Sequence, residues 1–386
     1  MQAGVTLIYL VAGEPSGDVL GARLMAALKA ARSDFSFAGI GGPHMAEHGF
    51  SPLFPMHELT VMGFVEALPR LRRLRRLLHR TAADIAARRP AVLVTIDSPG
   101  FSLRLLRLVA PSGVPRVHYV APQVWAWHEG RVKKFPGLWD RLLCLLPFEP
   151  PFFARHRLPA SFVGHPVLES GADAGDAGRF RAAHGLAADA PVLVLMPGSR
   201  RSEVHRLLPV FGRALTLVAA RVPGLVPVVP AAPAVAGVVQ HAAASWPVRP
   251  VVVTDNGEKH DAYAAAAAAL TKSGTSTLEL ALAGVPMVVA YRVNPLSAAI
   301  ARRVVRVEFA ALVNLLAGRA VVPEFMQSDC TPERLADGMH RLLTDAQAAA
   351  AQRDAFREVI ARLSPAEGTP SEAAARVVLE LFPPSA

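Results

Sequence analysis

The sequence predicts an α/β protein with two doubly wound, Rossmann-like domains and a C-terminal helical segment. Short aliphatic runs alternate with longer amphipathic segments, a pattern typical of parallel strands joined by helices. The alternation begins at residues 5–12 and begins again at Val192. Between residues 169 and 178 the composition changes to Gly, Ala and Asp, which indicates a linker. We therefore expect domains at 1–168 and 179–345, followed by helices at 346–386.

The composition limits the classes of protein to which the chain can belong. The chain has 386 residues, enough for two domains of ordinary size, and its 52% hydrophobic content allows each to bury a core. Its formal net charge of +10 favours anionic partners: phosphorylated small molecules, nucleic acid or an acidic membrane surface. Two distant cysteines, Cys144 and Cys330, argue against a disulfide framework or a zinc site, so a reducing cytoplasm fits. The first residues lack the basic region of a signal peptide, and we find no convincing membrane-spanning run.

The second domain opens with a strand, a tight turn and a helix over residues 192–209. The strand stops before Gly198 and Ser199, Arg200 follows, and Glu203 opens the amphipathic pattern. A helix that begins there directs free N–H groups and the positive end of its dipole at the turn. Arg200 adds a permanent positive charge, so the pattern predicts a phosphate or diphosphate site. The alternative is a plain helix start with solvent-facing arginines.

A second loop of the same kind follows a later strand. Gly274, Thr275 and Ser276 open the next helix, and Glu279 lies in its first turns. There the Glu279 carboxylate could accept hydrogen bonds from the hydroxyls of a ribose. It could instead be an acid that is simply favourable near a helix N-terminus.

The first strand ends in a loop that carries two acids and two glycines. Glu14, Ser16 and Asp18 would lie at the carboxyl edge of the sheet, where doubly wound folds bind ligands. The loop lacks the GxGxxG pattern, which argues against a nicotinamide cofactor. Capping of the following helix by Ser16 or Asp18 is the alternative explanation.

Another all-apolar strand, at 91–96, ends in Asp97. A carboxylate at a strand end, among apolar neighbours, can have a raised pKa and act as a general base. An Asx-type cap of the turn at 98–101 would explain the same residue.

The segment 61–81 has the most unusual composition of the chain. Its leucines recur at helical spacing and arginines occupy much of the remaining surface, which predicts a basic amphipathic helix on an anionic membrane. An ordinary sheet-covering helix with solvated arginines is the alternative. Nucleic acid binding is not favoured, because no exposed aromatic residues are interleaved for base stacking. The candidate membrane and acyl-chain residues are Met62, Phe64, Val65, Leu68, Leu71, Leu74, Arg72, Arg73 and Arg76.

Nine motifs, in order over nearly the whole chain, resemble the lipid-A-disaccharide synthase family. They are AGEPSGD (12–18), IGGPHM (40–45), TIDSPGF (95–101), YVAPQVWAW (119–127), FVGHP (162–166), PGSRRSE (197–203), SGTSTLELAL (273–282), NLLAGR (314–319) and VPEFMQ (322–327). Together these motifs are far more specific than a single glycine-rich loop.

The resemblance implies a GT-B inverting glycosyltransferase. Its substrates would be UDP-2,3-diacylglucosamine and 2,3-diacylglucosamine 1-phosphate, and its products a β-1,6-linked lipid A disaccharide 1-phosphate and UDP. Neither a metal nor a cofactor is implied. Members are peripheral membrane proteins of the bacterial cytoplasm, so the inner face of the inner membrane is the expected location. The helices at 346–386 would cross back or be exchanged within a homodimer.

The resemblance also implies particular site residues. The family's sensitive positions correspond to Ser16, Asp97, Arg200 and Asn314, although Val313 stands where a proline is expected before Asn314. The second domain would hold UDP through the residues of both phosphate-type loops, Glu279 and Asn314. The first would hold the lipid acceptor, with Asp97 as general base and Glu14 and Asp18 as rivals. A UDP-sugar epimerase and a membrane-bound nucleotide-binding regulator are the competing interpretations.

Overall fold

The computed structural model describes residues 5–59, 67–127, 129–294 and 307–382, with the backbone alone at 67–71. The chain divides into two compact units. Unit 1 comprises Met1–Pro166 and Leu363–Ala386, and unit 2 comprises Val167–Arg362. Each unit is built on its own parallel sheet, so each presents its own row of strand carboxyl ends.

Unit 1 contains a six-stranded sheet in the order β2-β1-β3-β4-β5-β6, and every described pair of strands is parallel. Because β1 pairs with both β2 and β3, the chain order reverses beside β1, the position at which doubly wound folds bind ligands. The strands are β1 (Thr6–Ala12), β2 (Phe35–Ile40), β3 (Val92–Ile96), β4 (Arg116–Tyr119), β5 (Arg141–Cys144) and β6 (Ala160–Phe162).

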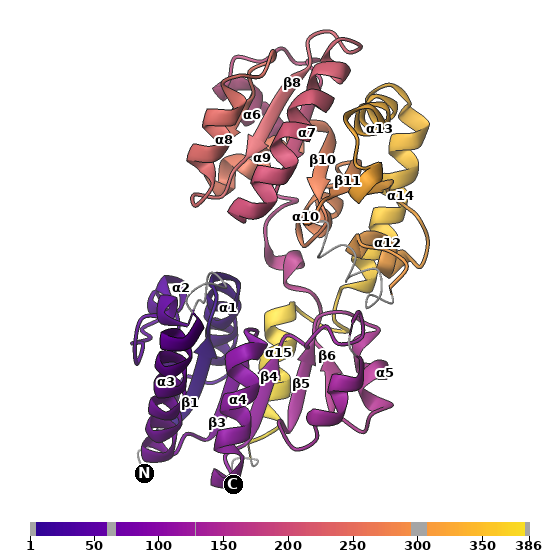
Figure 1. Cartoon of the computed structure of the whole chain (residues 1–386). Coiled ribbons are helices and arrows are strands. Elements are labelled where there is room, and N and C mark those ends of the chain that lie inside the picture. Colours follow the sequence, from indigo (N-terminus) through magenta and orange to yellow (C-terminus); the bar gives the residue numbers. More distant parts are fainter. Residues whose placement is uncertain (1–4, 60–66, 128, 295–306, 383–386) are drawn as a thin grey trace. The chain divides into compact units, whose positions relative to one another are not determined.

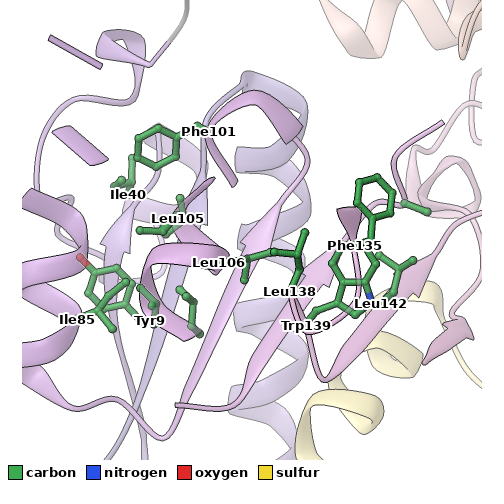
Figure 2. Packing of buried hydrophobic residues seen from close by; sticks show 14 of the residues in the cluster. Tyr9, Ile40, Ile85, Phe101, Leu105, Leu106, Phe135, Leu138, Trp139 and Leu142 are labelled. Carbon is green, nitrogen blue, oxygen red and sulfur yellow. The ribbon is translucent and has the colours of Figure 1, made fainter. Parts of the chain in front are cut away.

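Helices cover both faces of this sheet (Figure 1). Side chains alternate along β1, so Tyr9 and Val11 pack under α3 and α4, whereas Ile8 and Leu10 pack under α1 and α15. Figure 2 shows the first of these cores, with Tyr9, Ile85 and Phe101 among its buried residues. The helices are α1 (Pro15–Ala31), α2 (Pro43–Ala46), α3 (Ala67–Arg88), α4 (Pro99–Val109), α5 (Glu149–Ala154) and α15 (Pro370–Leu379).

Unit 2 repeats the architecture with a sheet in the order β12-β11-β10-β7-β8-β9, again parallel throughout its described pairs. The strands are β7 (Val192–Met196), β8 (Val226–Pro230), β9 (Val251–Val253), β10 (Ala266–Lys272), β11 (Met287–Tyr291) and β12 (Glu324–Met326). The helices are α6 (Ala177–Ala183), α7 (Arg201–Ala219), α8 (Ala236–Ala243), α9 (Asn256–Ala265), α10 (Ser276–Leu282), α12 (Leu312–Ala317), α13 (Pro332–Thr344) and α14 (Ala346–Arg362).

The C-terminal helices are divided between the units. α14 belongs to unit 2, where the Gln352 side chain bonds both the N–H and the C=O of Met287. α15 belongs to unit 1 and packs beside α1. Residues 346–386 therefore do not form one helical group, because the division falls after Arg362.

The expected linker at 169–178 belongs to unit 2. The buried carboxylate of Asp261 accepts a hydrogen bond from the backbone N–H of Asp176, at 2.7 Å, and pairs with Arg179. These bonds attach the Gly- and Ala-rich segment to α9. Among the described helices, none is both long enough and apolar enough to cross a bilayer.

Candidate active site

The loops after β1 and β3 bring two carboxylates together at the edge of the first sheet. The Ser98 hydroxyl, next to Asp97, lies 3.5 Å from a carboxylate oxygen of Glu14. Burial raises the pKa of Asp97, and the negative charge of Glu14 raises it further, while the Ser98 N–H that donates to Asp97 opposes the shift. Glu14 itself is exposed. The arrangement yields a proton acceptor that is stronger than an ordinary aspartate.

The backbone at this loop is strained. Asp97 and Ser98 have φ angles of 51° and 45°, in the left-handed region that non-glycine residues seldom adopt. The Asp97 N–H donates to the Tyr119 carbonyl at 2.8 Å, and the Ser102 hydroxyl donates to the Asp97 carbonyl at 2.7 Å. Gly13 lies against the loop, because a Cβ there would meet the Ser98 hydroxyl oxygen at 2.6 Å. Such strain is concentrated at functional sites.

The Asp97 side chain does not cap α4. Its only described hydrogen bond is from the N–H of the adjacent Ser98, at 2.8 Å. The N–H groups of Phe101 and Ser102, near the start of α4, donate instead to the Ser98 carbonyl. The capping alternative is therefore not what the geometry shows, and the carboxylate keeps acceptor capacity for a ligand.

Asp18 has a different role from the other residues of its loop. It is 1% exposed, and its carboxylate accepts hydrogen bonds from the backbone N–H groups of Gly42, His44 and Met45 at 2.7, 3.0 and 3.1 Å. It therefore caps α2 and joins the first turn of α1 to the loop after β2, which corrects its candidacy as a general base. Ser16 is exposed in the first turn of α1.

Sequence reasoning missed Glu149, at the start of α5. This carboxylate is 3% exposed and accepts hydrogen bonds from the indole N–H of Trp125, at 3.0 Å, and from the N–H groups of Leu145 and Leu146, at 3.1 and 3.0 Å. Burial raises the pKa of Glu149 to about 7, although the three donors oppose the shift. Glu149 thus holds the loop after β4, which presents the exposed indole of Trp127. In the sequence, Trp125 and Trp127 mark this loop as unusual, but nothing there indicates that the buried Glu149 holds it.

The corresponding edge of unit 2 is basic. Arg200 is the N-cap residue of α7, and its exposed guanidinium lies 3.3 Å from a carboxylate oxygen of Glu203. The Lys272 ammonium, from the end of β10, lies 3.1 Å from the same oxygen. Partial burial raises the pKa of Glu203, but Lys272 and Arg200 outweigh this and hold it below its usual range. Sequence reasoning named Arg200 and missed Lys272.

Two glycines let the loops of unit 2 approach this lysine. Gly198 has a φ of 115°, and a Cβ there would meet Glu203 at 2.6 Å and the Lys272 side chain at 3.3 Å. Gly274 has a φ of 151°, and its Cβ would lie 3.3 Å from the Lys272 ammonium. Ser199 and Thr275 are exposed beside these glycines. The phosphate-type loops predicted from the sequence therefore converge on one cationic group.

Two other predicted nucleotide contacts, Glu279 and Ser276, are bonded within the protein. Both donors to Glu279, the Lys259 ammonium and the Tyr263 hydroxyl, lie 3.2 Å from its Oε2, so among the described residues Oε1 has no partner. The Ser276 hydroxyl lies 3.0 Å from that of Thr271. These bonds fix the first turns of α10 on the rest of unit 2.

Asn314 does not present its amide to a ligand. It is 1% exposed; its NH₂ group donates to the Val322 carbonyl at 2.9 Å and to Glu324 at 2.7 Å. Its oxygen accepts the N–H groups of Val321 and Val322. The predicted direct contact with UDP is therefore not supported, because the amide of Asn314 is already bonded within unit 2. Glu324 in turn accepts the N–H groups at 310 and 311, and Ala310 accepts the Ser273 hydroxyl beside Gly274.

The predicted membrane helix is described in part. Met62, Phe64 and Val65 lie outside the described residues, as do the side chains of Leu68 and Leu71. Arg72 and Arg76 are exposed, and Arg73 pairs with Glu58 at 3.0 Å. Leu74 packs partly against the core. This part of α3 thus has a basic exposed face and an apolar face that packs against the core.

Comparison with known proteins identifies the family. A sequence model described as lipid-A-disaccharide synthetase matches residues 8–378. The lipid-A-disaccharide synthase of Granulibacter bethesdensis is 58% identical, with 97% of this chain and 98% of that protein covered. Within the described residues, no group of three or more His, Cys, Asp or Glu side chains is placed to hold a metal.

Solved structures show the fold. The glycotransferase of kitacinnamycin matches with a TM-score of 0.64 at 17% identity, covering 99% of this chain and all of that one. The UDP-GlcNAc 2-epimerase from Neisseria meningitidis matches with a TM-score of 0.62 at 12% identity, covering 97% and 99%. Fold similarity alone does not separate these activities. The sequence relationship does: the chain belongs to the lipid-A-disaccharide synthase family, glycosyltransferases that form the disaccharide of lipid A.

Proposed function

We propose that this enzyme joins UDP-2,3-diacylglucosamine to 2,3-diacylglucosamine 1-phosphate, with Asp97 as general base and Arg200 with Lys272 as the diphosphate-binding cations. The single observation that carries the proposal is the contrast between the two sheet edges: a carboxylate with a raised pKa in unit 1 and converging cations in unit 2. The reaction needs both functions, a base for an acceptor hydroxyl and a cationic site for the departing UDP.

The chemistry is a direct displacement. The 6-hydroxyl of the acceptor loses its proton to the Asp97 carboxylate as its oxygen forms a bond to the anomeric carbon of the donor. The bond from that carbon to the UDP oxygen breaks, and UDP leaves with the electron pair. Attack opposite the leaving group inverts the anomeric configuration, so an α-linked donor gives the β-1,6 product. Ser16, exposed near Glu14, would bind the acceptor sugar.

Negative charge grows on the β-phosphate during this step. Fixed donors aimed at that position stabilise the transition state more than the ground state. Arg200 and Lys272 would take this role, and Gly198, Ser199, Gly274, Thr275 and Ser276 would supply the close backbone and hydroxyl groups; the proximity of both cations to Glu203 supports this. The Oε1 of Glu279 would accept a ribose hydroxyl, whereas Asn314 would act through Glu324 on the loop at Ser273.

A thin-layer assay with both lipid substrates tests the proposal. We expect a disaccharide 1-phosphate and equimolar UDP, and folded protein that forms no disaccharide would refute it. Conversion of the UDP-sugar without acceptor would support an epimerase instead. UDP binding without turnover in the presence of both lipids would support a nucleotide-binding regulator.

We further propose that the protein binds, as a peripheral protein, the inner face of the inner membrane through α3. Each arginine near an anionic surface contributes about 1 kcal/mol. Replacing Arg72, Arg73, Arg75 and Arg76 by Glu should release the protein from anionic vesicles in a flotation assay. The matched control replaces exposed arginines of unit 2 by Glu, namely Arg334, Arg341, Arg353 and Arg357. Equal retention of both variants on the vesicles would refute the electrostatic part of this proposal.

Light scattering would test whether the protein forms a homodimer with exchanged C-terminal helices.

A further inference from the structure

An apolar groove lies between α3 and α4 on the outer side of unit 1. Its cavity volume is about 790 Å³, and its apolar lining comes from Leu74 and Leu78 of α3 and from Phe101 and Leu108 of α4. The two helices lie side by side (Figure 1). Leu108 is 37% exposed, one of three large hydrophobic residues exposed to this degree in the described part of the chain. A groove of this size and character suits a ligand with a hydrocarbon portion.

Four arginines border the groove. Arg72 and Arg75 come from α3, and Arg104 and Arg107 come from α4. Within the described residues, none of the four is ion-paired with a carboxylate; Arg107 donates to the Lys134 carbonyl at 3.0 Å, and Arg104 donates to the Gly100 carbonyl. The groove therefore combines an apolar floor with uncompensated positive charge. That combination matches a lipid that carries an anionic group.

The groove leads from the candidate active site. Gly100 belongs to its lining and lies three residues after Asp97, in the first turn of α4. Phe101 follows and has its ring in the core beneath α4 (Figure 2). A ligand in the groove would thus extend along α4 from the strained loop that holds the proposed base.

We infer that this groove binds the acyl chains of the lipid acceptor and that its bordering arginines bind the acceptor phosphate, an inference that rests on the proposed function. In 2,3-diacylglucosamine 1-phosphate the acyl chains are on C2 and C3 and the phosphate is on C1. C2 lies across the ring from C5, which carries the 6-hydroxymethyl group. One orientation therefore directs the chains along the groove and the reacting hydroxyl toward Asp97.

Substitution of Leu108 tests the apolar contact. Each methylene removed from an apolar site weakens binding about fourfold, so Leu108→Glu, which displaces several methylenes, should raise the Kd of the acceptor at least about tenfold. The Kd is measured in detergent micelles without UDP-sugar, by equilibrium binding of 2,3-diacylglucosamine 1-phosphate. A short-chain analogue of the same sugar phosphate should bind both proteins alike. Val5→Glu is the matched control, because Val5 is also an exposed apolar residue of unit 1 but does not line the groove.

Substitution of Arg104 tests the charged border. Arg104→Glu should weaken binding of the phosphorylated acceptor about tenfold or more and leave binding of the same lipid without its phosphate unchanged. Thermal unfolding confirms that each variant is folded; Leu108 and Arg104 are both exposed, so neither change disrupts the core.

Two results would overturn the inference. Equal Kd values for wild type and Leu108→Glu with the long-chain acceptor would overturn it. Loss of vesicle binding by Leu108→Glu, with an unchanged Kd in micelles, would also overturn it and assign the groove to the membrane surface. Because binding is measured without turnover, a failure to form disaccharide would refute the proposed reaction and leave the groove result interpretable.

Discussion

Both sheets are parallel and six-stranded, but their carboxyl edges differ in charge. In unit 1 the loops after adjacent strands β1 and β3 hold Glu14 and Asp97, and the pKa of Asp97 is raised. In unit 2 the loop after β7 holds Arg200, the adjacent strand β10 ends in Lys272, and the pKa of Glu203 is lowered. The charges thus suit one edge to accepting a proton and the other to binding an anion.

The edges also differ in how their loops achieve unusual backbone angles. In the loops after β3 and β4 of unit 1, non-glycine residues, Asp97, Ser98 and Val120, adopt positive φ. In the loops after β7 and β10 of unit 2, glycines, Gly198 and Gly274, do so, although Gln327 after β12 is a non-glycine residue with a φ of 50°. A non-glycine residue there stores strain but places a side chain at the edge, whereas glycine places the backbone itself close to the neighbouring charge. The difference agrees with side-chain chemistry in unit 1 and backbone contact with a phosphate in unit 2.

The largest expected effect is on catalysis at the acidic edge. Asp97→Asn should lower kcat by roughly 10²–10⁴-fold, because an amide cannot take the acceptor proton. Steady-state rates of disaccharide formation measure this, and a near-normal rate would transfer the role to Glu14.

The pH dependence of wild type and Glu14→Gln refines this prediction. Because the pKa of Asp97 is raised above its ordinary value of 3.8, kcat/KM should fall on acidification with an inflection above that value. Removing the Glu14 charge should move the inflection to lower pH. An unmoved inflection would show that the two carboxylates are not coupled.

The second effect is on stability. The pKa of Glu149 is about 7 in the folded protein and 4.5 ordinarily, so the folded state binds the proton more tightly. The stability contribution is fully present below pH 4.5 and is lost as the pH rises through about 7, a change of about 3 kcal/mol. Urea unfolding should show this slope in wild type but not in Glu149→Gln. The same slope in both proteins would exclude Glu149 as its source.

The third effect is on binding at the basic edge. Arg200→Ala should raise the KM for the UDP-sugar or lower kcat/KM by about 10- to 100-fold, since a charge-assisted hydrogen bond contributes about 1.5–3 kcal/mol. Arg206→Ala, another exposed arginine of α7, is the matched control. Equal losses in the two variants would mean that general positive charge, not the position of Arg200, attracts the nucleotide.

The smallest expected effect comes from exchanging serine and glycine at positive-φ positions of the two edges. Ser98→Gly should stabilise unit 1 by about 1 kcal/mol, because glycine tolerates a φ of 45°. Gly198→Ser should destabilise unit 2 by at least about 1 kcal/mol, because its Cβ would meet Glu203. Thermal unfolding measures both. Shifts in the same direction would contradict the contrast between stored strain and glycine.

Local patterns in the sequence predicted much of the fold and part of the candidate site. Aliphatic runs followed by Gly, Pro or Ser mark strand ends, and polar residues just beyond them must lie at a sheet edge when the sheet is parallel. Asp97 and Arg200 were found in this way, since each directly follows such a run or turn. Asp18 stands in a similar place, whereas Asn314 lies in α12; nothing local reveals that either side chain is turned inward.

By itself, then, the sequence determined the two α/β units, the family and the residues that emerge from strand ends, because strand and helix periodicity is written in neighbouring residues. Only the tertiary structure decided which polar groups are already bonded. Asp18 meets the loop at 42–45, Asn314 meets Glu324, Glu149 meets Trp125, and Lys272 meets Glu203. Those partners come from separate loops and elements, and a buried polar side chain must find them wherever the fold places them.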